Sequence, residues 1–175
     1  GGTGNLEIKE STIAIAEGPM FYVTNTSVNV DLENVKFGFA KDAPLAEIVA
    51  GDWGEAGKNG GNLVLNAEEQ HLKGDIVVDA ISSVKFDMGS KVTYKGAINP
   101  NKQGTAVVVM DKTSKWTLAA DSYLESIQFE KTVEKGIKQI NSKGYNIYYN
   151  PKNPANAALA GKTYSLKGGG LLLTY

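Results

Sequence analysis

The feature that most constrains the fold is a pattern of short alternating segments that returns about every 22 residues. The segments NLVLNAEEQHLKGDIVVDA (62–80), SVKFDMGSKVTYKGAINP (83–100) and AVVVMDKTSKWTLAADSY (106–123) share one order of apolar and polar positions. Within each segment, apolar residues recur at every second position, which is the period of a β-strand and not of an α-helix. The sequence therefore predicts short strands joined by turns of Gly, Asn, Asp and Ser.

Matching the three segments residue by residue gives shifts of 21 to 24 residues between equivalent positions. Apolar residues that match in this way are expected to point inward and to stack on one another. The matched inward positions are Leu65 with Phe86 and Val109, Leu72 with Tyr94, Ile76 with Ile98, and Val92 with Trp116.

A repeat of this size favours an all-β, single-stranded parallel β-helix, a solenoid whose rungs hold about 21–24 residues. Stacked rungs explain why residues match one by one, because each inward side chain packs against its equivalents in the neighbouring rungs. An antiparallel sandwich, which also has short strands at regular spacing, is the alternative. We expect one domain over 1–175, with N-terminal rungs and a Gly-rich loop (1–61), the clearest repeats (62–130), and a terminal rung and cap (131–175).

Two segments near the end depart from the strand pattern. KTVEKGIKQI (131–140) is a weak helix candidate that Gly136 interrupts, and the Ala-rich residues 155–160 are a second one. The last rung of a solenoid exposes apolar side chains and unpaired strand edges. The tail from about residue 150 is therefore expected to cap it.

Composition excludes several classes of protein. The chain has 175 residues, 42% of them hydrophobic, which suffices for one domain with a substantial core. All 18 basic residues are Lys, and the net charge is −1, which argues against nucleic acid as a partner. The lack of Cys excludes disulfides, zinc–thiolate sites and a cysteine nucleophile. No apolar run approaches the roughly 20 residues of a membrane-spanning helix.

The first residues, GGTGNLEI, carry no signal-peptide pattern and lead directly into a strand. We therefore expect the parent chain to be longer, with any targeting or anchoring segment outside these residues. The lack of cysteine leaves the compartment open, because many secreted bacterial proteins also lack it.

Five segments over about residues 60–175 carry a resemblance to a known group of proteins: LKGDIVVDAISSV, GSKVTYKGAINP, SKWTLAADSYLESI, INSKGYNIYYN and AGKTYSLKGGG. In order and spacing they resemble the repeat-and-tail pattern of the adhesin-like and pertactin-like β-helical regions of large bacterial surface proteins. The resemblance implies a right-handed parallel β-helix that is secreted and exposed on a bacterial cell surface. It implies no catalytic residues, because such regions serve as scaffolds and binding surfaces.

Side chains that could carry chemistry are few. His71, the only histidine, falls at an outward strand position without a recognisable partner, so neither a catalytic triad nor a transition-metal site is expected. Asp75 and Asp121 match across rungs, but Ala97 occupies the position between them and breaks the acidic column.

Asp87 and Asp111 form the remaining acidic pair, near equivalent turns of neighbouring rungs. Two such carboxylates could act as a hydrolase pair or, with backbone carbonyls, weakly hold a Ca²⁺ ion. The favoured alternative is that each Asp ends a strand and caps its turn. Pectate-lyase-like enzymes use Ca²⁺ with an Arg base, and a chain without Arg would have to assign that step to a Lys.

The Gly-rich segment AGDWGEAGKNGG (50–61) breaks the repeat, and it lacks the GxxxxGK[ST] pattern of a phosphate-binding loop. Trp53 either folds back to fill the core or stands out as a platform on which a sugar ring or a protein partner can stack. In the second case the loop is the predicted contact site, with Asp52, Glu55 and Lys58 as polar neighbours of Trp53.

The sequence thus predicts a non-enzymatic structural or adhesive module of a secreted bacterial cell-surface protein, with no cofactor. Its expected partner is a glycan or a host or cell-surface protein. The alternative is a carbohydrate-binding module or, less favoured, a polysaccharide lyase or hydrolase on the same fold. The two functions differ in whether acidic and aromatic side chains from several rungs converge in one groove.

Overall fold

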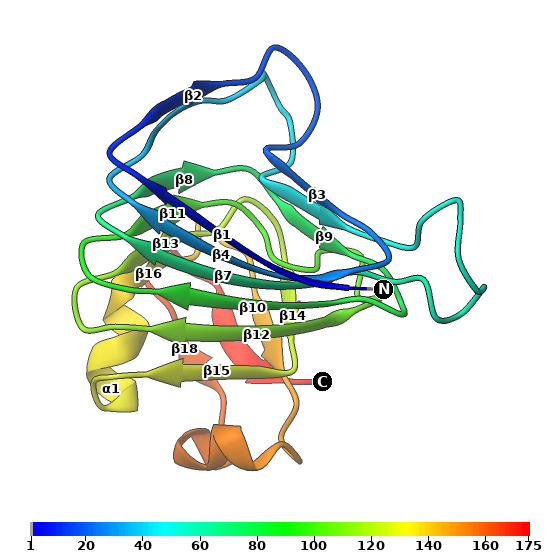
Figure 1. Ribbon diagram of the computed structural model, residues 1–175. Helices are drawn as coiled ribbons and strands as arrows, with labels where there is room; N and C mark the ends of the chain where they lie inside the picture. The colour runs from blue at the N-terminus through cyan, green and yellow to red at the C-terminus, as the bar shows by residue number, and fades with distance from the viewer. Residues whose placement is uncertain (1) are drawn as a thin grey trace.

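The computed structural model describes residues 2–175 and is a parallel β-solenoid of about seven turns with almost no helix (Figure 1). The predicted parallel β-helix is confirmed. The antiparallel sandwich is wrong, because among the described residues only one pair of strands, near the C-terminal end, runs antiparallel. One continuous cluster of buried apolar side chains extends from Val23 to Leu172 inside the solenoid.

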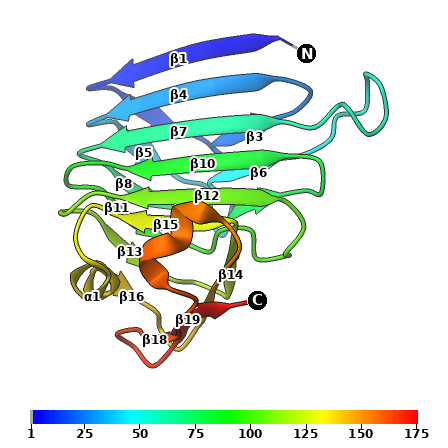
Figure 2. The same ribbon diagram turned by 90° about the horizontal axis from the view of Figure 1, so that it is seen from below.

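The first face of the solenoid is a six-stranded parallel sheet, in which each strand pairs with its equivalent in the next turn (Figure 2). Its strands, in order, are β1 (Thr3–Lys9), β4 (Ser27–Glu33), β7 (Asn62–Glu68), β10 (Ser83–Met88), β12 (Thr105–Met110) and β15 (Ser126–Phe129). Equivalent residues are 21 apart from β7 to β10, as the sequence predicts, and 22 apart from β10 to β12, one fewer than the predicted match of Phe86 with Val109. From β4 to β7 they are 35 apart, so this turn carries extra residues.

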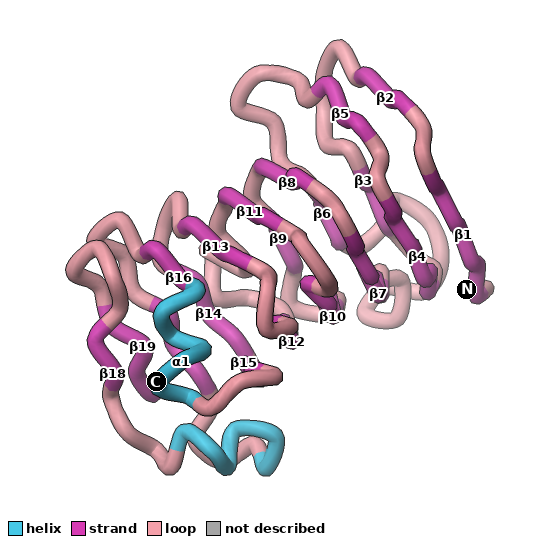
Figure 3. The backbone as a smooth tube through the Cα atoms, turned by 90° about the vertical axis from the view of Figure 1, so that its left-hand side faces the viewer, coloured by secondary structure: helices cyan, strands magenta, loops and turns pink. Residues whose placement is uncertain are grey.

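The second and third faces are built from shorter strands. The second face contains β8 (His71–Lys73), β11 (Thr93–Lys95), β13 (Lys115–Thr117) and β16 (Ile140–Asn141), which follow one another in Figure 3. The third face contains β3 (Phe21–Val23), β6 (Ala46–Ile48) and β9 (Ile76–Val78), and then β14 (Ser122–Leu124), β17 (Ile147–Tyr149), β19 (Leu171–Thr174) and the antiparallel β18 (Tyr164–Ser165). A separate pair, β2 (Thr12–Ala14) and β5 (Lys36–Gly38), does not continue the sheet of β8.

The central inward column of the first face differs from the predicted stack at one position. Leu65 and Phe86 pair in register and are fully buried, as predicted. Phe86 then pairs with Val108, whereas Val109 pairs with Asp87 on the outward side. The prediction for Val109 was wrong because the run AVVVM (106–110) is apolar at every position, so that alternation does not show which valines point inward.

Trp116 is buried in the core, as predicted, but in a different column. It pairs with Tyr94, which pairs with Leu72 in turn, so the shift is 22 residues and Trp116 does not match Val92. A slip of two residues keeps every side chain on its own face. The alternation therefore fits a shift of 24 residues as well as one of 22, and only the strand pairing distinguishes them.

Both predicted helical segments are present and short. The first holds α1 (Val133–Gly136) and the 3₁₀ turn η1 (Ile137–Gln139), and the second is the 3₁₀ turn η2 (Pro154–Leu159). Gly136 does not break the first segment: its backbone is helical, and the ring of Phe129 lies so close that a Cβ atom would sit 2.3 Å from Phe129 Cγ.

The tail lies against the last strand of the first face. Asn156 in η2 is buried, and its side-chain oxygen accepts a hydrogen bond from the Ile127 N–H at 3.0 Å. Its side-chain nitrogen donates to the carbonyl oxygens of Glu125 at 3.0 Å and Asn150 at 2.8 Å. The first bond occupies an edge N–H group of β15, which is the place where a cap is expected, and the effect of the tail on solubility stays a prediction.

The inward column gives the first testable prediction. Leu65→Asp and Phe86→Asp should each unfold the protein, because an unpaired charge in an apolar core costs several kcal/mol. Val109→Asp is the matched control: its side chain faces outward beside Asp87 and is half-buried, so the variant should stay folded. Thermal unfolding followed by circular dichroism measures all three. A folded Phe86→Asp variant, or an unfolded Val109→Asp variant alone, would contradict this register.

Removal of residues 150–175 tests the cap. The truncation uncovers the edge of β15 and the apolar partners of Leu172, so the protein should self-associate through exposed strand edges. Asn156→Ala in the full chain is the control, because it loses the three hydrogen bonds but keeps the tail in place. We expect it to melt earlier without aggregating. Light scattering reports both, and a monodisperse, stable truncation would refute the capping role.

Candidate functional site

The segment 49–61 projects from the solenoid between β6 and β7 (Figure 1). Thirteen residues connect these strands, whereas four residues connect β9 to β10 one turn later. Asn59 holds the base of the loop: its side-chain amide donates to the carbonyl oxygens of Gly51 at 2.6 Å and Trp53 at 3.2 Å. The Asn59 carbonyl oxygen accepts in return from the N–H groups of Gly51 and Asn25. The loop is therefore anchored at its base, with its tip in solvent.

Trp53 lies at the exposed part of this loop, with 65% of its surface accessible. It does not fill the core, so the core-filling alternative is wrong. Glu55 and Lys58 form an exposed ion pair at 2.9 Å, and Asp52 is exposed next to Trp53 in the sequence. The structure thus places all four predicted contact residues on one projecting loop, and binding at this loop stays a prediction.

The aspartates at the turns are engaged with backbone groups. Asp75 Oδ1 accepts from the N–H of Ala97 at 2.8 Å, and Asp121 Oδ1 accepts from the N–H of Asn146 at 2.8 Å. In both cases the carboxylate ties its turn to the equivalent turn of the next rung. These two side chains therefore stabilise the stacking of turns, which is a structural use of the acidic position.

Asp111 caps its own turn, because its Oδ1 accepts from the N–H groups of Thr113 at 2.7 Å and Ser114 at 2.9 Å. Asp87 pairs in register with Val109, so the two carboxylates sit two positions apart along neighbouring strands. Within residues 2–175 no group of three or more His, Asp or Glu side chains is placed to hold one metal ion. A calcium ion at Asp87 and Asp111 stays an untested hypothesis.

His71 faces outward on β8, as its place in the alternation predicts. Its Nδ1 atom is within hydrogen-bond distance of the Thr93 hydroxyl, which occupies the equivalent position on β11. We did not predict this contact, although it follows from the match of Leu72 with Tyr94, which places Thr93 beside His71.

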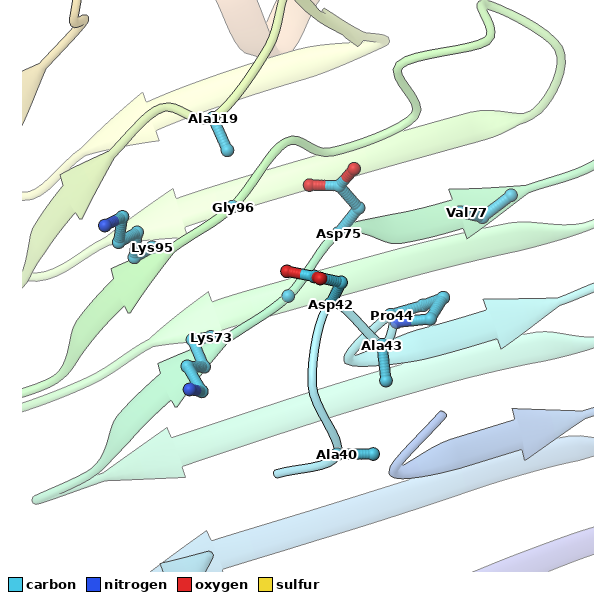
Figure 4. A pocket seen from close by; sticks show the side chains of 11 residues that line it. Ala40, Asp42, Ala43, Pro44, Lys73, Asp75, Val77, Lys95, Gly96 and Ala119 are labelled. Atoms are coloured by element: carbon cyan, nitrogen blue, oxygen red, sulfur yellow. The ribbon is translucent and has the colours of Figure 1, made fainter. Parts of the chain in front are cut away.

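A cleft of about 370 Å³ opens beside the second face, where β5 departs from the path that β8 continues (Figure 4). One wall is the connection from β5 to β6, and the other is the turn from β8 to β9 with its equivalent in the next rung. The residues that line it are Ala40, Asp42, Ala43, Pro44, Lys73, Gly74, Asp75, Val77, Lys95, Gly96 and Ala119. It brings two lysines and two aspartates together.

Backbone contacts hold the walls of the cleft together. The Leu45 N–H donates to the Asp75 carbonyl oxygen at 2.9 Å, which joins the two walls at one end. Gly74 has a φ angle of +109°, and a Cβ atom there would lie 2.5 Å from the Leu45 nitrogen, so this close approach requires glycine. Beneath the floor, the Tyr94 hydroxyl donates to the Gly74 carbonyl oxygen at 2.7 Å. Burial, with a smaller contribution from Asp75, raises the pKa of the Tyr94 phenol well above its usual value, so it stays a neutral donor.

Sequence reasoning missed the cleft but held one signal for it. The matched pairs Leu72 with Tyr94 and Ile76 with Ile98 are confirmed by the strand pairing. Because LKGDI and YKGAI then align, Lys73 and Lys95 must share one outward column. No comparable signal placed Asp42 or Pro44, because they belong to a connection without repeat equivalents.

Comparison of the chain with protein-family models, with curated proteins and with solved structures gave no match. In the described part of the chain, no helix is long and apolar enough to cross a membrane. By its fold and its surface features, the protein is a parallel β-solenoid that carries a projecting loop with an exposed tryptophan and a cleft lined by charged residues.

The exposure of Trp53 yields a stability prediction. Trp53→Ala should leave the melting temperature nearly unchanged, because exposed side chains away from special contacts contribute within about 0.5 kcal/mol. Asn59→Ala is the matched variant at the base of the same loop. It should lower the free energy of unfolding by about 1–3 kcal/mol, because it deletes a buried hydrogen-bonding amide. Denaturant titration measures both, and a large loss in Trp53→Ala would put Trp53 back in the core.

Proposed function

We propose that this chain is a non-enzymatic adhesive or structural module of a secreted bacterial cell-surface protein. The observation that carries the proposal is the 65% exposed Trp53 on a loop whose base is fixed by buried Asn59. Loops on rigid scaffolds are where binding residues concentrate, and tryptophan is enriched among the residues that carry most of the binding energy at interfaces. Trp53 offers a flat apolar face, while Asp52, Glu55 and Lys58 offer hydrogen-bonding groups around it.

The resemblance of residues 60–175 to adhesin-like and pertactin-like regions supports the same function. It rests on the order and spacing of short segments, and the solenoid agrees with the fold that the resemblance implies. The turn aspartates further support a non-enzymatic function. The carboxylates of Asp75, Asp111 and Asp121 accept hydrogen bonds from backbone N–H groups at turns. The proposed partner of the loop is a glycan or a host or cell-surface protein.

A carbohydrate-binding module is the second candidate function, and the cleft favours it. In the cleft, acidic and basic side chains from three successive turns converge, although no aromatic residue lines it. The aromatic residue Trp53 lies outside the cleft, so the loop and the cleft are separate contact areas. Cleavage of polysaccharides by Asp87 and Asp111 is the less favoured form of this candidate, since their carboxylates do not share a strand position.

Binding assays with the loop variant test the proposal. The full chain is screened on a glycan array and against cell-surface protein extracts from candidate host cells. Trp53→Ala should lose at least about tenfold in affinity for any ligand found, the range expected for a central aromatic contact. Tyr145→Ala is the matched control, because Tyr145 is also an exposed aromatic residue, at 41%, but lies between β16 and β17 in a later turn of the solenoid.

Equal loss in both variants, or no loss in Trp53→Ala, would refute the loop as the contact site. Product release is measured on the same polysaccharide ligands. We expect none above background. Turnover that Asp87→Asn or Asp111→Asn abolishes would replace the adhesive function with the enzymatic one.

A further inference from the structure

We propose that the cleft beside the second face binds a sugar ring that carries an acid group, as one unit of an acidic polysaccharide. The acid group lies at Lys73 and Lys95, and the ring hydroxyls face Asp42 and Asp75. This inference rests on the proposed function only in that the solenoid is a binding scaffold. It uses a site other than the Trp53 loop, and it deepens the second candidate function, a carbohydrate-binding module, by naming the ligand as an acidic sugar.

The size and the walls of the cleft fit a sugar ring. Its volume of about 370 Å³ lies in the range of small-molecule sites. The uncharged residues of the lining have small and mostly apolar side chains. They leave room for a sugar ring and give its C–H groups a surface to pack on. These residues are Ala40, Ala43, Pro44, Gly74, Val77, Gly96 and Ala119.

The two lysines form the cationic end of the cleft. Lys73 and Lys95 pair in register on β8 and β11, and the backbones of adjacent strands lie about 4.8 Å apart. Like charges at directly opposite positions repel each other. Within residues 2–175 neither lysine takes part in an ion pair, and the Lys73 ammonium instead lies 5.7 Å from the centre of the Phe39 ring. An anion held between the two ammonium groups would relieve this repulsion.

The two aspartates set the rest of the chemistry. In Figure 4 the carboxylates of Asp42 and Asp75 lie between the lysines and Pro44. Asp75 keeps one oxygen on the Ala97 N–H, while its other oxygen can accept from a ligand, and Asp42 is exposed. Hydroxyl groups donate to such carboxylates, whereas a chain of phosphates would be repelled by them. The combination selects a ligand with an acid at one end and hydroxyls at the other, which is an acidic sugar.

The second face beyond the cleft suits a polymer that runs along the solenoid. The column of Lys73 and Lys95 continues with Thr117 and Asn141, and Lys115 lies in the neighbouring outward column. These strands carry no outward carboxylate. The first face differs, because its outward positions hold five carboxylates: Glu7, Asp31, Glu33, Glu68 and Asp87. Longer acidic oligosaccharides should therefore bind more tightly than single sugars.

Calorimetric titration of the full chain with oligogalacturonate tests the proposal at low and at physiological salt. Its methyl ester, which has the same ring without the charge, is the neutral arm, and a sulfated oligosaccharide of equal length shows whether sulfate can replace the carboxylate. We expect the acid to bind at least about tenfold more tightly than the ester, since charge-assisted contacts are the stronger ones. Lys73→Gln/Lys95→Gln should lose this preference, and Asp42→Asn should weaken both the acid and the ester.

Lys85→Gln is the matched control, because Lys85 is an exposed outward lysine on the first face and should not affect binding. The cleft site is overturned if the double variant binds the acid like the wild type, if Lys85→Gln loses as much, or if the wild type does not distinguish acid from ester. Trp53→Ala in the same titration separates the two proposals. A loss in this variant alone would place sugar binding on the loop, which retains the proposed function and rejects the cleft.

Discussion

Parallel hydrogen bonding between equivalent residues of successive turns is the constraint on which this structure depends. Each strand of the first face finds its backbone partners only in the turns before and after it, with Ser83 paired to Asn62 on one side and Thr105 on the other. Once one residue is paired, the parity of the strand decides which side chains enter the core. Leu65, Phe86 and Val108 are buried together for this reason, and the interior fills as a series of columns.

The same register also brings outward side chains of like charge together. The two faces differ in whether these charged side chains have partners. On the first face three of the five carboxylates have partners: Lys9 lies 2.9 Å from Glu7 and 3.6 Å from Glu33, and the Asn66 amide donates to Asp31 at 2.8 Å. On the second face Lys73 and Lys95 have no such partner among the described residues. An unrelieved column of like charge weakens the fold slightly, and a ligand of opposite charge is the physical means of offsetting it.

Most of the fold could be predicted from the sequence because the repeat carries the strand pairing in its spacing. Leu72 with Tyr94 and Ile76 with Ile98 were matched correctly, since Gly74 and Gly96 mark the same turn in both repeats. The predicted register was wrong at Val109, because the run around it is apolar at every position and does not show which residues point inward. The loop residues around Trp53 could be named as a candidate site because they break the repeat, but their exposure could not. The cleft could not be predicted, because it forms where two strands leave a sheet, and strand departure has no sequence period.

One turn of the solenoid supplies the special part of both candidate sites. The turn from β4 to β7 spans 35 residues instead of 21, and its additional residues fall at two corners. Seven residues connect β5 to β6, where two connect β8 to β9, and the longer β6–β7 connection is the Trp53 loop. Additional residues cannot enter a filled core, so they must move outward at the corners, which in repeat proteins often form the binding face. At one corner they project as the loop, and at the other they fold back over Gly74 and enclose the cleft. The regular turns contribute the other part of the cleft, which is a rigid floor with Lys73 and Lys95 at the fixed spacing of paired strands.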